Sequence, residues 1–316
     1  MKQIKSLTRL TTILTLASLL IIGCTKEKSE NNNLTDTEEA QASTYSMEAN
    51  AEADVVFNDV FDNVMGVNNE VGMEGTGVFG RESGTSSGSS SYDPFARGDS
   101  LNPPNRCFTV SIIRLSAPDI FPVKIIVDFG AGCQGRDGHI RSGKIITTYT
   151  GRLVAPGKKA TTTFENFYFD SIHVEGTHEV TNTSTSLIPS FKIVVENAKL
   201  TKPNGNYVNW NAVRTVTQID GMGTQFFPLD DVYKLESAGN GKVKRGDVIV
   251  AWNTETVEPL IKRFNCRWIV KGIVRTARLN LSTNSPWVAR LNYGNGDCDN
   301  KAILTINGIS TEITLP

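Results

Sequence analysis

The sequence predicts an all-β protein, an antiparallel sandwich, open barrel or extended meander, with one N-terminal amphipathic helix on a flexible tether. Three observations support this fold class. Segments rich in Thr, Ile, Val and aromatic residues alternate in polarity after residue 105. Turn signals rich in Gly and Asn separate many of these segments. No segment after residue 105 has convincing helical periodicity, and short strands joined by hairpin turns are typical of antiparallel sheets.

The predicted strands follow one another closely through the body, residues 105–316. They cover residues 107–114, 123–128, 143–150, 160–169, 171–180, 190–200, 207–219, 247–253, 266–276, 287–293 and 301–314. Turns are predicted at residues 203–206, 239–241 and 294–296. Asn307-Gly308, flanked by apolar alternation, is the strongest hairpin signal in the chain.

The first 23 residues have the pattern of a lipoprotein signal peptide. Lys2, Lys5 and Arg9 precede a short apolar stretch that ends at the lipobox, residues 20–24. The apolar stretch is shorter than the roughly 20 residues of a bilayer span, which disfavours the alternative of a transmembrane anchor. We expect cleavage before Cys24 and acylation of this cysteine with chains such as palmitate. The expected location is the outer membrane, with the periplasmic and cell-surface sides both open.

Charge is divided unevenly along the chain, whose formal net charge is -1. Residues 25–104 hold fifteen Asp and Glu against four Lys and Arg, whereas residues 105–316 hold eighteen acids against twenty-five bases. An acidic arm therefore precedes a basic body. The basic body favours an anionic partner, which is lipopolysaccharide, an acidic glycan or the chain's own arm. The predicted export disfavours nucleic acid as a partner.

The arm divides into three parts by composition. Residues 24–46 carry the lipidated cysteine and a polar tether that is expected to be disordered, and residues 67–104 form a Gly/Ser-rich linker. Between them, residues 47–66 form a predicted amphipathic helix. Its apolar face contains Val56, Phe57, Val60, Phe61 and Val64. This face either docks on the chain's own body or binds a partner in the helix-in-groove mode.

Four cysteines remain after the lipidated one: Cys107, Cys133, Cys266 and Cys298. An even number in an exported protein favours two disulfides, for which three connectivities exist. The body resembles two degenerate halves, each with two strands, an aromatic-glycine turn and a cysteine, so we favour Cys107 with Cys133 and Cys266 with Cys298. A four-cysteine metal site is disfavoured because the sequence has no CxxC pair.

Several short motifs of the body carry a family resemblance. They are Asp128-Phe129-Gly130, Gly132-Cys133, Asp137-Gly138, Arg141, Gly143-Lys144-Ile145, residues 174–177, Cys298-Asp299-Asn300 and Asn307-Gly308. Across the whole body the chain resembles a family of cysteine-containing lipoproteins of Bacteroidota, of the Flavobacteria type, that has no assigned activity. The resemblance implies O-glycosylation after Asp before an apolar residue, for which Ser100 and Ser171 are the candidates.

Residues suited to catalysis are few. Of the three histidines, His173 and His178 are expected on opposite faces of one strand, and His139 in a turn. No HExxH, Gly-x-Ser-x-Gly, phosphate-loop or dinucleotide motif is present. Two acidic pairs are weighed as the acid and base of a glycosidase, although adjacent acids are more often solvent-facing turn residues. They are Asp230 with Asp231 and Glu255 with Glu258.

Two binding features are weaker. Asn295, Asp297 and Asp299 imitate the first ligand positions of an EF-hand loop, but the glycine and the bidentate Glu of that loop are missing. Eight aromatic residues could form a carbohydrate-stacking face, although core packing is their commoner role. They are Trp210, Trp252, Trp268, Trp287, Tyr149, Tyr168, Tyr207 and Tyr293.

These observations together favour a lipid-anchored envelope protein with a non-enzymatic binding or structural role, for example an accessory subunit of an outer-membrane complex. The alternatives are a carbohydrate-binding surface lipoprotein and, less favoured, a glycoside hydrolase. No metal or cofactor is expected.

Overall fold

The computed structural model describes one N-terminal helix and most of the body. The described residues are 36–65, 107–119, 121–135, 138–153, 155–223, 230–266, 268–279, 288–306 and 308–315. The predicted signal peptide, Cys24 and the predicted linker 67–104 lie outside these residues, as does the glycosylation candidate Ser100.

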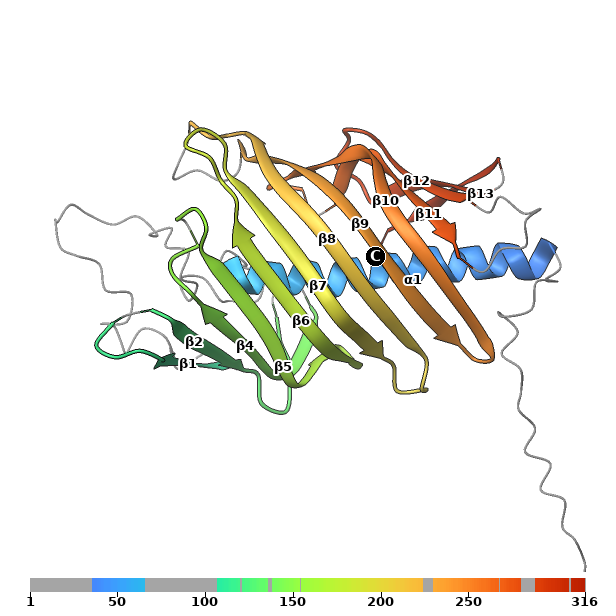
Figure 1. Ribbon diagram of the computed structural model, residues 1–316. Helices are drawn as coiled ribbons and strands as arrows, with labels where there is room; N and C mark the ends of the chain where they lie inside the picture. Colours follow the sequence, from blue (N-terminus) through green and yellow to red (C-terminus); the bar gives the residue numbers. More distant parts are fainter. Residues whose placement is uncertain are drawn as a thin grey trace, which may run out of the picture.

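The described strands form one antiparallel sheet in which each strand lies beside its neighbours in the sequence (Figure 1). They are β1 (Thr109–Arg114), β2 (Val123–Asp128), β3 (Cys133–Gln134), β4 (Ile140–Tyr149), β5 (Lys159–Phe169), β6 (Ile172–Asn182), β7 (Ser190–Thr201), β8 (Tyr207–Asp220), β9 (Val232–Arg245), β10 (Val248–Arg263), β11 (Ile269–Arg278), β12 (Val288–Asn295), β13 (Lys301–Ile306) and β14 (Ile309–Thr314). The short β3 pairs with β4 beside this path. Because β1 and β14 are the two edges, the sheet is open. The all-β prediction is confirmed, and the extended meander is the architecture observed.

The helix α1 (Asp36–Met65) lies along the inner face of the curved sheet (Figure 1). It contacts β5, β6 and β8 through β12. Alternate strand residues point toward α1 and form one apolar core with it, as the two-residue period of strands requires. The helix therefore fills the inner face, and the other strand side chains lie on the outer face.

The helix begins earlier than predicted. The sequence placed a tether at residues 24–46 and a helix at 47–66, whereas α1 starts at Asp36. Ala42, Ser43 and Ser46 are all buried against the sheet. Their small side chains give no apolar stripe in the sequence, and packing against the sheet stabilises this part of the helix.

One predicted turn is wrong. Residues 239–241 lie in the middle of β9, a strand that the sequence did not predict. Gly241 faces Trp252 on β10, and a Cβ added to Gly241 would lie 2.3 Å from the indole Cζ2. The glycine is needed because the buried Trp252 ring covers the backbone at this point, so Gly here marks a close approach and not a turn.

Most other predicted strands are observed with shifts of a few residues at their ends. The exception is β10, which runs to Arg263 where the prediction ended at residue 253, and which contains bulges between Thr256 and Lys262. The predicted hairpin near residue 307 is confirmed because Ile306 pairs with Ile309.

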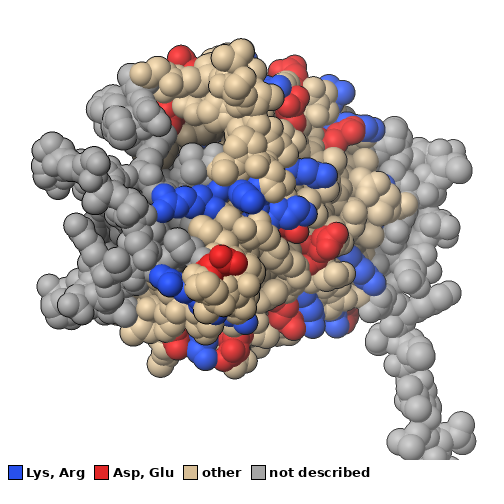
Figure 2. Space-filling model, turned by 60° about the vertical axis from the view of Figure 1, so that its left-hand side comes forward, with Lys and Arg blue, Asp and Glu red and all other residues tan. Residues whose placement is uncertain are grey.

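The surface carries both signs of charge. In the view of Figure 2, Lys and Arg side chains form a band across the middle of the molecule, with Asp and Glu around it. Basic side chains therefore lie close to one another on the side of the molecule seen in this view.

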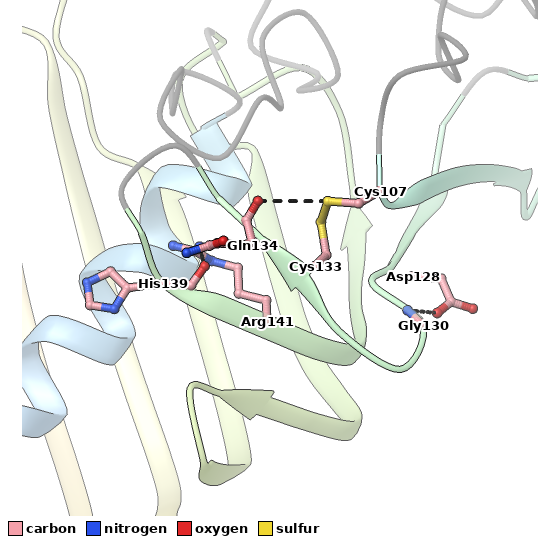
Figure 3. The surroundings of a disulfide bond; sticks show 7 residues. All are labelled: Cys107, Asp128, Gly130, Cys133, Gln134, His139 and Arg141. Atoms are coloured by element: carbon pink, nitrogen blue, oxygen red, sulfur yellow. Dashed lines mark hydrogen bonds between the residues drawn. A yellow bond between two sulfur atoms is a disulfide. The ribbon is translucent and has the colours of Figure 1, made fainter.

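Both predicted disulfides are confirmed. Cys107 is bonded to Cys133 (Figure 3) and Cys266 to Cys298. In each case the first cysteine precedes one strand of an antiparallel pair, β1 with β2 or β11 with β12, and the second follows the other strand. The open ends of a hairpin lie side by side, which explains why the two cysteines meet.

Candidate functional site

The interface between α1 and the sheet contains a buried ion pair. Arg141 on β4 donates from Nη2 to Oδ1 of Asp59 at 2.5 Å and from Nε to Oδ2 at 3.1 Å. The two side chains are 1% and 7% exposed. Such a two-pronged contact fixes the direction as well as the distance of the partner. The pair therefore sets the position of α1 along the sheet.

A second Arg–Asp pair lies further along the helix. Arg214 on β8 binds Asp54 through Nη2 and donates from Nη1 to Oδ1 of Asn58 at 2.5 Å. Burial raises the pKa of the Asp54 carboxyl above its ordinary value, and the Arg214 guanidinium opposes that effect. Arg214 thus holds two consecutive turns of α1.

Two further ion pairs, which are more exposed than the Arg141–Asp59 pair, join the helix to the sheet. Lys202 lies 2.7 Å from Glu52, and Arg245 binds Glu48 while its guanidinium carbon lies 4.8 Å from the centre of the Tyr45 ring. Acids of the arm therefore meet bases of the body at four places along α1. The positive charge of the body is therefore partly neutralised by the acidic arm of the same chain, which is one of the three anionic partners predicted from the sequence.

The predicted apolar face of the helix is directed at the sheet. Val56, Phe57, Val60 and Val64 are at most 4% exposed, and Phe61 is half-buried against the same core. The structure thus shows the first of the two predicted alternatives, docking on the chain's own body. These five side chains are not available to a partner while α1 is docked.

Phe57 stands at the centre of an aromatic cluster. Its ring centre lies 5.5 Å from that of Trp210, 6.2 Å from that of Phe164 and 6.2 Å from that of His178. The Trp210 Nε1 donates to Oδ1 of Asn50 at 3.1 Å. Aromatic burial and a satisfied indole N–H together anchor the middle of the helix.

His178 on β6 is fully buried under Phe57, and neither of its ring nitrogens has a hydrogen-bond partner among the described residues. Burial, with the nearby Arg214 charge, lowers the pKa of His178 to about 3. Its imidazole is therefore neutral at physiological pH. The prediction that His173 and His178 face opposite sides of the strand is confirmed, since His173 lies beside Glu175 at the surface with 31% of its side chain exposed.

The last turn of α1 is capped by a tyrosine of the sheet. The Tyr149 hydroxyl donates to the carbonyl of Val64 at 2.9 Å. The final carbonyls of a helix lack partners within the helix, so a buried end requires such a donor. Burial also raises the pKa of Tyr149, which keeps the hydroxyl protonated as a donor.

The acidic pairs weighed for catalysis have other partners. Asp231 is buried and accepts hydrogen bonds from Gln218 Nε2 and the Tyr233 hydroxyl, both at 2.8 Å. The exposed Glu255 forms an ion pair with Arg275. Asp230 and Glu258 are exposed. Asp231 therefore has a structural role, because it joins the start of β9 to β8.

His139 lies in the turn before β4 and contacts Asp170 from the β5–β6 turn, with 3.0 Å between Nδ1 and Oδ2. The glycosylation candidate Ser171 is exposed in that same turn. An exposed tight turn is accessible to a modifying enzyme, so the implied glycosylation there stays a prediction.

The calcium candidates lie at the β12–β13 connection. Asn295 ends β12, and Asp297 and Asp299 are exposed beyond it. Asp299 Oδ1 accepts a hydrogen bond from the Lys301 backbone N–H at 2.9 Å, as in an Asx turn. Within the described ranges no cluster of three His, Cys, Asp or Glu suitable for a metal is found.

The aromatic residues do not form an exposed platform in the described part of the chain. Trp210, Trp252 and Tyr149 are buried, and Tyr207, Trp268 and Tyr293 are half-buried. Tyr168 is exposed and its ring lies 4.8 Å from that of His173. Trp287 lies outside the described residues. Tyr168 is therefore the one exposed aromatic residue among these candidates in the described chain, and the half-buried His173 lies beside it.

A shallow hollow of about 330 Å³ lies on the outer face, where β10 bulges away from β9. Its lining consists of Val213, Thr215, Glu236, Ser237, Ala238, Thr256, Val257 and Pro259. One carboxylate among small and apolar groups does not form an acid–base pair. The hollow suits a surface contact better than a reaction.

Comparison with known proteins identifies no match among family models, curated proteins or solved structures. The class of protein is therefore given by the fold alone: an open antiparallel meander whose inner face is covered by one helix. Among the described helices, none combines the length and the apolar character that a membrane span needs.

Proposed function

We propose that the chain is a lipid-anchored envelope protein with a non-enzymatic binding or structural role, an accessory subunit of an outer-membrane complex. The observation that carries this proposal is that two ion pairs, Asp59–Arg141 and Asp54–Arg214, hold α1 against the sheet. The helix connects the predicted anchor at Cys24 to a rigid body. A fixed connection of this kind suits a protein that presents a surface near the membrane.

The docked helix shortens the distance between anchor and body. Twelve positions separate Cys24 from Asp36, the first residue of α1. At roughly 3.3–3.6 Å per residue, they span at most about 40 Å. The N-terminal half of α1 packs near β12 and β13, because Met47 joins a cluster with Ala289, Leu291 and Ala302. That end of the sheet would be held closest to the bilayer.

The surface left for a partner is the outer face of the sheet. Neighbouring strands bring Lys199, Lys242 and Lys244 to one end of this face, where Lys199 and Lys242 both flank Asn209. Lys199 shares Glu175, whereas Lys242 and Lys244 have no ion-pair partner within the described residues. These lysines would attract an anionic surface of a protein or glycan.

The experiment is to purify the tagged full chain from membranes of the native host in mild detergent and identify what is recovered with it. We expect one stoichiometric outer-membrane protein, recovered less well with Lys242→Glu plus Lys244→Glu. The matched control is Lys124→Glu plus Lys192→Glu, elsewhere on the sheet, which should retain the partner. Recovery of the chain alone would contradict a stable complex.

The exposed Tyr168, with the half-buried His173 beside it, favours a second function, carbohydrate binding at the outer face. Sugar rings stack on exposed aromatic rings, and Lys199 and Glu175 lie beside His173 on the same face. Binding of an acidic oligosaccharide that Tyr168→Ala abolishes, with the melting temperature unchanged, would favour this function. Equal binding by both proteins would rule out Tyr168 as the stacking platform.

A further inference from the structure

The strand β14 offers a free backbone edge. In the described chain β14 pairs with β13 alone. Ile306 and Ile309 flank a two-residue connection, so they form a hydrogen-bonded pair, and the bonded pairs then recur at every second residue. The hydrogen bond from the Leu315 N–H to the Asn300 carbonyl agrees with this pattern, because Leu315 lies an even number of residues from Ile309. The backbone groups of Ser310, Glu312 and Thr314 therefore point away from β13.

The edge also lacks the features that usually block strand pairing. β14 contains no proline, and its register with β13 has no bulge. Its one charged residue, Glu312, is neutralised by Lys301 at 2.8 Å. Ile309 is 74% exposed, the most exposed large apolar residue of the sheet strands described. Natural edge strands are normally protected by charges, bulges or proline, so an unprotected one calls for a partner.

We propose that β14 pairs antiparallel with β14 of a second copy of this chain, about a two-fold axis at Thr311. The two sheets then form one continuous sheet. In this register Ile309 faces Ile313 of the second copy, Thr311 faces its counterpart, and Ser310 faces Glu312. On the inner side the two isoleucines meet and Thr311 meets its counterpart, and on the outer side Ser310 meets Glu312. The same surface serves both copies, as two-fold symmetry requires.

The charge of Glu312 selects this register over its neighbours. Residues that face each other must point to the same side of the sheet and must both direct their backbone groups toward the other strand. An alternative register must therefore keep Ser310, Glu312 and Thr314 opposite residues of that same set. One step toward the C-terminus places Glu312 opposite Glu312 of the second copy, and like charges directly opposite are destabilising. One step toward the hairpin pairs only residues 309–311 and leaves Glu312 and Ile313 without a partner strand residue. In the proposed register Ser310 and Glu312 also meet with their outward backbone groups, which forms hydrogen-bonded pairs on both sides of Thr311.

A disulfide trap tests the register. Thr311→Cys in the exported full chain should give a covalent dimer under mild oxidation, because two residues facing each other across a non-hydrogen-bonded pair lie within disulfide reach. Ser310→Cys is the matched control: its counterpart is displaced by two positions along the strand, beyond the roughly 7 Å limit between Cα atoms. No dimer from either variant, or a stronger dimer from Ser310→Cys, would overturn the proposal.

A second variant tests the association without a new cysteine. Ser310→Pro removes an outward N–H while leaving the β13 pairing in place, since proline is tolerated at the open side of an edge strand. We expect the dimer dissociation constant, from light scattering of the detergent-solubilised full chain, to rise at least about tenfold. Ser310→Thr keeps the N–H and should dimerise as the native chain does. A monomeric native chain, or equal dimerisation by the Pro and Thr variants, would refute pairing through β14.

Discussion

The carboxylate of Asp59 and the guanidinium of Arg141 are joined by two hydrogen bonds although 82 residues separate them in the sequence. Both groups are almost completely buried, so each stabilises the charge of the other away from water. The pair therefore joins the acidic arm to the basic body inside the buried interface between α1 and the sheet.

Removing one partner of this pair should destabilise the protein strongly. Asp59→Asn removes the carboxylate charge that the buried Arg141 guanidinium binds in two places, at a cost of roughly 3–5 kcal/mol in the free energy of unfolding. Denaturant unfolding followed by circular dichroism measures the change. The control is Glu48→Gln at the exposed Glu48–Arg245 pair, which should cost about 1 kcal/mol or less. Equal losses in the two variants would mean that burial does not decide the cost.

Acid should unfold the protein partly through His178. The folded pKa of about 3 lies below the ordinary value of 6.5, so the unfolded chain binds this proton more tightly. The stability from neutral His178 is complete above pH 6.5 and is lost as the pH falls from 6.5 toward 3. At pH 5 the loss is about 2 kcal/mol. His178→Phe should remove this part of the pH dependence in denaturant titrations at pH 7 and 5, and an unchanged slope would contradict it.

A side chain at Gly241 should disturb the core. Gly241→Ala places a Cβ against the indole of Trp252, at a distance that real contacts do not show. We expect a loss of roughly 1–3 kcal/mol, as for other overpacked cores, together with a shift in tryptophan fluorescence. Gly223→Ala is the control, because no atom of the described residues lies within 4 Å of its added Cβ. A Gly241 variant as stable as this control would show that Trp252 can move aside.

The Cys266–Cys298 disulfide should increase the free energy of unfolding of the chain. It closes a loop with a sequence separation of 32, worth about 3–4 kcal/mol in the chain-entropy estimate. Replacing both cysteines by serine should lower the unfolding midpoint accordingly, and peptide mapping without reductant should recover residues 266 and 298 in one linked peptide. A linked peptide joining residue 266 to residue 107 or 133 would contradict the connectivity.

Local patterns in the sequence predicted most of the strands, the hairpin at residues 307–308 and the cysteine pairing. Period-two alternation depends on each strand alone, and Asn307-Gly308 favours its turn wherever the rest of the chain lies. The disulfides could be predicted because hairpin ends lie side by side in any antiparallel meander. The apolar stripe around Phe57 likewise predicted a helix before its position was known.

Other features depend on contacts between distant segments, and only the tertiary structure decided them. Ser43 and Ser46 carry no helical signal, yet they lie in α1 because the sheet buries them. Gly239 and Gly241 resemble a turn until Trp252 is placed above Gly241. The docking of α1 rests on guanidinium groups at Arg141 and Arg214 that meet their carboxylates only in the folded chain. A one-dimensional pattern records periodicity, whereas the burial of a charge depends on what the fold brings beside it.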